Sequence, residues 1–221
     1  SDISTFSFHP VKPITTGEGG MITTNNKKIY EKLLIYRTHG IHKDKKKFIN
    51  KNLAFDKTGD VNRWYYEMIE LGYNYRITDL QASLGNSQLK KIDKFTRNRN
   101  IIAKMYNKGF KENNLISTPR LEKNVKHAYH LYTLMIDFKK LKKTRNQVMT
   151  ELANLKIGSQ VLYIPVFLQP YYMKKYKINK SDYKNSITYY EQALSIPVFP
   201  SLKKEEVLYI IKKINKIVQK N

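Results

Sequence analysis

The sequence predicts a mixed α/β protein, because segments with strand character alternate with segments of helical periodicity. Short runs rich in β-branched and aromatic residues are separated by stretches whose apolar residues recur every three or four positions. Hydrophobic residues make up 41% of the 221 positions, which is enough to bury a core. This alternation indicates an α+β or α/β arrangement.

Near the N-terminus, a predicted β-hairpin presents one lysine on a stiff turn. Two β-rich runs, Thr5–Phe8 and Met21–Thr24, flank a segment punctuated by proline and by the glycines of the string GEGG. Pro10 and Pro13 fix φ on either side of Lys12. Schiff-base chemistry needs such a lysine, since the amine must be held within reach of a carbonyl. On these residues alone, an ordinary surface lysine in a hairpin is the favoured interpretation, because lysine is abundant in this chain.

A helix and a long connection follow the hairpin. The spacing of apolar residues predicts a helix over residues 28–36. Residues 39–66 then form a polar, lysine-rich connection, and connections of this length are usually functional or disordered. We expect a surface excursion that ends near the active site at residues 64–66.

The string GYNYR, residues 72–76, precedes two further predicted helices. Thr78 fits an N-cap, and Gln81 three residues later completes a capping box. The first of these helices continues to Ile92, and the second covers residues 93–107.

A smaller α+β unit is predicted from residue 108 onward. Its expected elements are strands at 130–137 and 159–163, helices at 144–155 and 183–194, and an aromatic loop at 165–172. Ser201 is expected to cap a final amphipathic helix over residues 203–220. One face of that helix is apolar and consists of Val207, Ile210, Ile211, Ile214 and Ile217.

The formal net charge of +23 raises the alternative of a basic nucleic-acid-binding module. Most of the 41 basic residues are lysines, whereas surfaces that read phosphates usually favour arginine. The lysines are also dispersed, with only Lys43–Lys47 forming a short cluster. Asn, Ile and Tyr are plentiful too, which indicates an A/T-rich coding sequence as the source of the charge.

The sequence lacks the residues that several other classes of site require. The chain has no cysteine, so it has neither a disulfide framework nor a thiolate metal site. The pairs His39/His42 and His127/His130 each lack a third ligand for a metal. No apolar run approaches the roughly 20 residues of a membrane helix. We therefore expect a soluble, cytoplasmic protein.

Five strings together cover nearly the whole chain: FSFHPVKPITTGEGGMITT, LGYNYRITDLQASLGNSQLKKID, HAYHLYTLMID, GSQVLYIPVFLQPYY and YYEQALSIPVFPSL. They resemble the DegT/DnrJ/StrS family of PLP-dependent sugar aminotransferases, most of all the members that act on 4-keto-6-deoxy nucleotide sugars. The resemblance implies fold type I, with a partial large PLP-binding domain in residues 1–107 and a small C-terminal α+β domain in residues 108–221. It also implies a long preceding segment that carries most of the large domain's sheet.

The same resemblance implies roles for individual residues. Lys12 is the catalytic lysine that binds pyridoxal 5′-phosphate, and Ser7 and Asn74 hold the cofactor phosphate. Asn74 serves the partner subunit, so a homodimer with a shared active site is implied. The residues expected to contact substrate are His9, Arg76 and Tyr163. The implied substrates are a keto nucleotide sugar and an amino-acid donor, glutamate, and the product is an amino sugar nucleotide for surface glycan biosynthesis.

Some positions depart from the family pattern. Many relatives carry histidines around residues 160–168, where this chain has Leu162 and Phe167, so the choice of sugar stays open. Family dehydratases carry histidine in place of the lysine, and Lys12 argues against that branch. A truncated, non-catalytic form of an aminotransferase is the remaining alternative.

Overall fold

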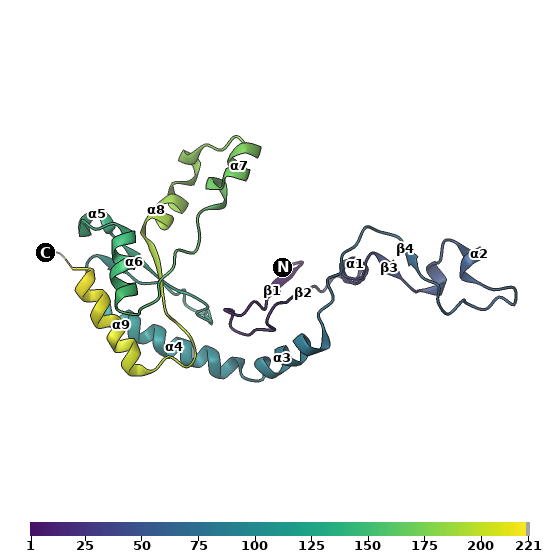
Figure 1. The fold of residues 1–221 in the computed structure, drawn as a ribbon, viewed down its shortest axis with the longest axis horizontal. Coiled ribbons are helices and arrows are strands. Elements are labelled where there is room, and N and C mark those ends of the chain that lie inside the picture. Colours follow the sequence, from purple (N-terminus) through teal and green to yellow (C-terminus); the bar gives the residue numbers. More distant parts are fainter. Residues whose placement is uncertain (220–221) are drawn as a thin grey trace. The chain divides into compact units, whose positions relative to one another are not determined.

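The computed structural model describes residues 1–219, and the chain divides into two compact units, each made of helices and short strands (Figure 1). The first unit covers Ser1–Lys90, and the second begins at Lys91. The division precedes the expected boundary at residue 107, because the helix that follows Lys91 packs into the core of the second unit. The assignment of these units to domains of a complete enzyme stays a prediction. Within the described residues, no helix combines the length and apolar character needed to cross a bilayer.

The first unit is built from short elements joined by long turns. Its elements are β1 (Ser4–Ser7), β2 (Gly20–Thr23), α1 (Lys27–Tyr36), β3 (Ile41–His42), η1 (Lys45–Lys47), α2 (Lys51–Ala54), β4 (Glu67–Met68) and α3 (Asp79–Leu89). Two antiparallel pairs, β1–β2 and β3–β4, form separate sheets. The predicted hairpin strands and the first helix are confirmed to within one residue at each end.

The expected capping box begins α3. Thr78 Oγ1 accepts a hydrogen bond from the Gln81 N–H at 3.3 Å, and Gln81 Oε1 accepts one from the Thr78 N–H at 3.1 Å. Such caps satisfy N–H groups that have no partner inside the helix and typically contribute about 1 kcal/mol. The helix ends at Leu89, slightly before the predicted end at Ile92.

The polar connection at residues 39–66 contains a small aromatic core. Phe48 is only 5% exposed, and its ring lies 4.8 Å from Tyr65, 5.6 Å from His42 and 6.4 Å from Phe55, measured between ring centroids. The β3–β4 pair closes the excursion at its base. The polar composition of the connection did not indicate this core, because a few aromatic rings that pack around Phe48 are enough to form it.

The second unit is an α+β arrangement around a three-stranded sheet. Its strands are β5 (Ile116–Ser117), β6 (Tyr132–Ile136) and β7 (Ala193–Ile196). The antiparallel sheet has the order β5-β6-β7. Its helical elements are α4 (Ile92–Gly109), α5 (Phe138–Leu141), α6 (Arg145–Asn154), η2 (Val166–Leu168), α7 (Pro170–Lys175), η3 (Lys180–Tyr183), α8 (Lys184–Gln192) and α9 (Lys204–Ile217).

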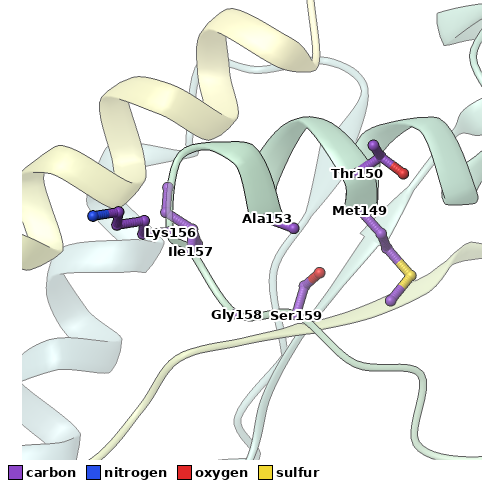
Figure 2. Close-up of a pocket in the computed structure, with 7 residues that line it drawn as sticks. All are labelled: Met149, Thr150, Ala153, Lys156, Ile157, Gly158 and Ser159. Carbon is purple, nitrogen blue, oxygen red and sulfur yellow. The ribbon is translucent and has the colours of Figure 1, made fainter.

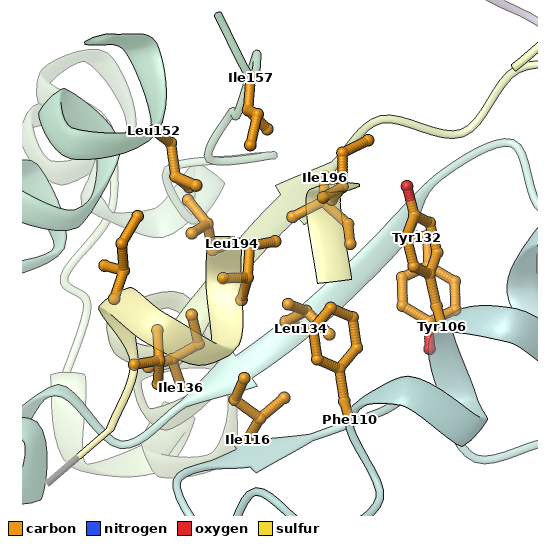
Figure 3. Packing of buried hydrophobic residues seen from close by; sticks show 14 of the residues in the cluster. Tyr106, Phe110, Ile116, Tyr132, Leu134, Ile136, Leu152, Ile157, Leu194 and Ile196 are labelled. Carbon is orange, nitrogen blue, oxygen red and sulfur yellow. The ribbon is translucent and has the colours of Figure 1, made fainter. Parts of the chain in front are cut away.

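The central strand β6 organises the core of the second unit. Tyr132, Leu134 and Ile136 alternate along it and are completely buried, as expected for a strand with one face on a core. Figure 3 shows these side chains packed with Leu194 and Ile196 of the neighbouring strand and with side chains from the helices. Full burial of each such side chain contributes about 1.5–3 kcal/mol.

Two predictions for the sheet were wrong. Residues 159–163 do not form a strand and contribute only an isolated bridge between Gln160 and Ser195. The strand in the sheet is instead β7, whose first residues were predicted as the end of a helix. All four of its residues are buried, so its sequence shows no alternation that would distinguish a strand from a buried helical turn.

The final helix has the predicted apolar face but a different start. Val207, Ile210, Ile214 and Ile217 are buried, and Ile211 is partly buried. The helix begins after Lys203, whose N–H donates to Glu206 Oε2 at 2.7 Å, so the predicted cap at Ser201 was wrong. The predicted end at Lys220 lies outside the described residues.

A buried arginine joins three segments of the second unit. Arg99 of α4 is 5% exposed, and its Nη1 donates to the carbonyl oxygens of Tyr129 at 2.9 Å, His130 at 3.3 Å and Val198 at 2.8 Å. Burial lowers the pKa of the Arg99 guanidinium, but an arginine retains its charge in proteins. The charged group therefore ties α4 to the chain before β6 and after β7.

We expect Arg99→Met to destabilise the protein by about 2–3 kcal/mol, because buried carbonyl groups then lose a charged donor. Arg97→Met is the matched control, since Arg97 lies on the same helix and is exposed. Urea unfolding of both variants measures the difference. Equal unfolding midpoints for the two variants would contradict the structural role of Arg99.

Candidate active site

Residues 8–19, the lysine loop, connect β1 to β2 and carry Lys12. The loop is closed at its base by the Phe8 N–H, which donates to the Gly19 carbonyl oxygen at 2.8 Å. The Phe8 carbonyl oxygen accepts from the Thr16 N–H at 3.0 Å and from Thr15 Oγ1 at 3.0 Å. Three hydrogen bonds therefore hold both ends of the loop at Phe8.

Lys12 lies on a tight turn within this loop. Its N–H donates to the His9 carbonyl oxygen at 2.9 Å, and Pro10 follows His9. Proline is favoured at this position of a β-turn because its φ is already near the required value. Lys12 itself is half-buried. The stiff turn predicted from the two prolines is therefore present.

The return of the loop to β2 requires glycine. At Gly19 φ is +154°, and a Cβ there would lie 2.3 Å from Thr16 Oγ1. A Cβ on Gly20 would lie 2.8 Å from the Phe6 carbonyl oxygen on the paired strand. These glycines let the backbone close over Thr16, which is only 3% exposed.

Helix α3 packs against the buried side of the lysine loop. Thr16 Oγ1 donates to the Glu18 carbonyl oxygen at 2.6 Å, and Gln81 Nε2 donates to the same oxygen at 3.0 Å. One turn along the helix, a Cβ on Gly85 would lie 2.9 Å from Thr16 Cγ2. The loop is thus fixed to α3 by a hydrogen bond and by close packing.

Gly85→Ala tests this packing. Alanine in a helix interior is normally about 1 kcal/mol more stable than glycine, but here the new methyl group would press on Thr16 Cγ2. We expect Gly85→Ala to give no gain in the wild-type background. With Thr16→Ser, which removes Cγ2 and keeps the hydroxyl, the same substitution should recover a gain of about 1 kcal/mol. Urea unfolding of the four proteins measures the coupling, and equal effects in both backgrounds would contradict the contact.

Three of the residues predicted for the site lie close together in sequence at the lysine loop. Ser7 ends β1, and its Oγ accepts from the His9 N–H at 3.5 Å. His9 Nε2 lies 3.9 Å from Glu18 Oε1, and both side chains are largely exposed. Such an exposed pair contributes little to stability, so His9 is available for other contacts. The hairpin thus gathers Ser7, His9 and Lys12.

Asn74 and Arg76 lie on a second segment of the first unit. The flanking residues fix its backbone: the Tyr73 N–H donates to the Tyr36 carbonyl oxygen at 2.7 Å, and the Tyr75 N–H donates to that of Arg37 at 3.0 Å. Asn74 and Arg76 are exposed. Both side chains are therefore presented on the surface from a fixed backbone.

Tyr163, the remaining predicted residue, belongs to the second unit. It is 70% exposed and lines an open hollow of about 490 Å³ with aromatic neighbours that include Phe167 and Tyr189. The Phe167 ring stacks on Tyr183 with 4.3 Å between centroids. The prediction of a loop at residues 165–172 was wrong, since this segment contains η2 and the first residues of α7, and none of its aromatic side chains is buried.

A further hollow of about 440 Å³ lies at the end of α6 (Figure 2). Its seven lining residues are Met149, Thr150, Ala153, Lys156, Ile157, Gly158 and Ser159. They include no carboxylate and no imidazole, so they offer no acid–base pair and we assign them no chemistry.

Sequence reasoning missed a buried acid in the excursion. Glu67 accepts from the N–H groups of Ile49 at 2.9 Å and Asn50 at 2.8 Å and from Tyr65 Oη at 2.8 Å. His42 Nε2 lies 3.5 Å from its other oxygen, and both side chains are 9% exposed. Within residues 1–219, no group of three or more potential ligands could hold a metal ion. The pair therefore organises the excursion, and no local sequence pattern indicated it.

The pKa of Glu67 should control this excursion in acid. Burial raises the pKa of the carboxyl, but the donors from Ile49, Asn50 and Tyr65 and the nearby His42 outweigh burial and hold it below its ordinary value. A carboxyl group whose pKa is lowered by folding stabilises the folded state at pH values above its unfolded pKa of about 4.3. That stabilisation is lost as the pH falls through the pKa of the folded state.

We therefore expect hydrogen-exchange protection of the Ile49 and Asn50 amides to fall below about pH 4. Glu67→Gln should show the loss already at neutral pH. Glu70→Gln, at an exposed carboxylate nearby in sequence, should behave as wild type. Protection that is independent of pH in the wild-type protein would contradict the role of the carboxylate.

Comparison with known proteins shows the family to which the chain belongs. The model of the DegT/DnrJ/EryC1/StrS aminotransferase family matches residues 1–215. The chain belongs to this family. A UDP-4-amino-4,6-dideoxy-N-acetyl-beta-L-altrosamine transaminase of Campylobacter jejuni is 34% identical over 220 residues, which is 100% of this chain and 53% of that protein.

Solved structures agree with the family match. Helicobacter pylori PseC, an aminotransferase involved in the biosynthesis of pseudoaminic acid, superposes with a TM-score of 0.85 at 28% identity and covers 99% of this chain and 53% of its own. The PLP-form of Spr1654 from Streptococcus pneumoniae has a TM-score of 0.82 at 27% identity, with coverage of 99% and 52%. The predicted α/β fold of type I transferases is confirmed. The chain spans about half the length of the relatives it matches.

Proposed function

We propose that the complete protein carrying this chain is a pyridoxal phosphate-dependent aminotransferase that converts a keto nucleotide sugar to an amino sugar nucleotide. The observation that carries the proposal is the turn that holds Lys12. Its backbone is fixed by hydrogen bonds to His9 and, through the loop base, to Phe8. A lysine so placed offers a primary amine from a fixed backbone, which covalent chemistry with a carbonyl requires.

The residues present fit this cofactor by the chemistry of their donors. Lys12 supplies a primary amine, the group that would bond to the aldehyde carbon of the cofactor. Ser7 Oγ accepts from the His9 N–H and keeps its own proton for donation to a phosphate oxygen. Asn74 carries two further N–H donors on an exposed side chain. The cofactor, when bound, supplies the electron sink for the reaction.

Each side chain then has a definite task. With the cofactor bound, Lys12 Nζ would take a proton from the substrate carbon and return it as the general acid–base group. Ser7 and Asn74 hold the phosphate and so fix the cofactor's orientation. We propose that Asn74 does this for the partner subunit of a homodimer, consistent with its exposure on a fixed segment. Glutamate is the proposed amino donor.

The sugar nucleotide is the finer part of the proposal. Similarity to a transaminase of an altrosamine nucleotide supports a 4-keto-6-deoxy nucleotide sugar, used in surface glycan biosynthesis. Arg76 is an exposed guanidinium suited to a phosphate group, and His9 lies on the same loop as Lys12. Tyr163, in its aromatic hollow, is proposed to contact the sugar.

Lys12→Ala tests the proposal. The full-length protein is incubated with pyridoxal phosphate, reduced with borohydride and digested, and the labelled peptide is identified by mass. We expect the label on the Lys12 peptide in the wild type and its loss in the variant, with transamination slowed by about 10³-fold because the acid–base group is gone. Lys28→Ala, at an exposed lysine on α1, should retain both. A label at another lysine in the wild type would overturn the assignment.

A further inference from the structure

We propose that Gln81 is a positioning residue for Lys12, and that it acts through the donor nitrogen of its side-chain amide. This rests on the proposed function of Lys12. Gln81 does not lie on the lysine loop but 63 residues from its hydrogen-bond partner Glu18. Its contribution is to hold the loop in place while Lys12 reacts.

The amide oxygen and the amide nitrogen of Gln81 make different hydrogen bonds. Oε1 accepts from the Thr78 N–H and hydroxyl, each at 3.1 Å, which completes the cap of α3. Nε2 donates to the Glu18 carbonyl oxygen at 3.0 Å. The cap needs only an acceptor, and glutamate serves as well as glutamine in a capping box. The amide nitrogen is therefore required only for the lysine loop.

The contact at Glu18 reaches Lys12 through the loop's own hydrogen bonds. The Glu18 carbonyl oxygen also accepts from Thr16 Oγ1, and the Thr16 N–H donates to the Phe8 carbonyl oxygen. Phe8 and Thr16 bracket the segment that carries Lys12. Displacement of Glu18 would therefore move Thr16, which holds one end of the segment that carries Lys12.

The chain contains a natural control. Helix α6 begins with the same box, in which Gln147 Oε1 accepts from the Thr144 N–H at 2.7 Å and from its hydroxyl at 3.1 Å. Within residues 1–219, the Gln147 amide nitrogen donates to no distant carbonyl. Each glutamine thus completes a cap of the same kind, and they differ in the hydrogen bond that Gln81 donates to the Glu18 carbonyl oxygen.

Gln81→Glu keeps the cap acceptor, removes the donor and sets a carboxylate against the Glu18 carbonyl. In the full-length protein with pyridoxal phosphate, we expect the rate of borohydride-trapped label at Lys12 to fall about fivefold, the factor that corresponds to one net hydrogen bond. The pH midpoint of the bound cofactor's visible absorption should also shift. Gln147→Glu should leave both the rate and the midpoint at the wild-type values.

Gln81→Lys provides the converse variant, because its ammonium can donate to the Glu18 carbonyl but cannot complete the cap. It should retain the labelling rate at Lys12, located by peptide mass, while lowering the unfolding midpoint. If Gln81→Lys labels as slowly as Gln81→Glu, a donor at this position does not maintain the rate and the inference is overturned. The same holds if Gln81→Glu matches Gln147→Glu in rate and absorption. Absence of label at Lys12 in the wild type would instead refute the proposed function.

Discussion

The carbonyl oxygen of Glu18 accepts two side-chain donors, and the geometry of the lysine loop depends on it. Thr16 Oγ1 reaches it from within the loop, and Gln81 Nε2 reaches it from α3. Both lone pairs of this carbonyl oxygen then accept a hydrogen bond, so the acceptor is fully satisfied. Gly19 must lack a side chain for Thr16 to lie there, and Gly85 must lack one for α3 to approach. Local turn chemistry and helix packing therefore fix the loop together.

The two units are stabilised in different ways. In the first, few side chains are buried, among them Thr16, Phe48 and Ala54, and most of the order comes from turns, caps and short strand pairs. The second has a continuous apolar core between the sheet and helices α4, α6 and α9. Stability need not be uniform along a chain, and segments rich in exposed backbone hydrogen bonds open most easily. Lys12, the lysine that we propose to bind the cofactor, thus lies in the unit that buries less apolar surface.

Local signals predicted the features that local interactions determine. Pro10 and Pro13 specify a stiff turn through φ, Thr78 and Gln81 specify a cap, and the apolar residues of α9 specify its buried face. Features made by distant partners were not predictable. Arg99 is defined by carbonyl groups on segments far along the chain, Glu67 by N–H groups at Ile49 and Asn50, and β7 by its pairing with β6. The resemblance to a family predicted a role for Lys12, whereas the hydrogen bond from Gln81 to Glu18 required the structure.

The excursion between β3 and β4 begins and ends at one backbone crossing. The Ile69 N–H donates to the Gly40 carbonyl oxygen at 2.9 Å, and a Cβ on Gly40 would lie 1.7 Å from the Glu70 carbonyl oxygen. Because the crossing is made by main-chain atoms, side-chain changes within the excursion leave it in place. The entropy of closing a loop grows only slowly with its length. Insertions and deletions between these strands can therefore remodel the surface during evolution while the segment that carries Asn74 keeps its position.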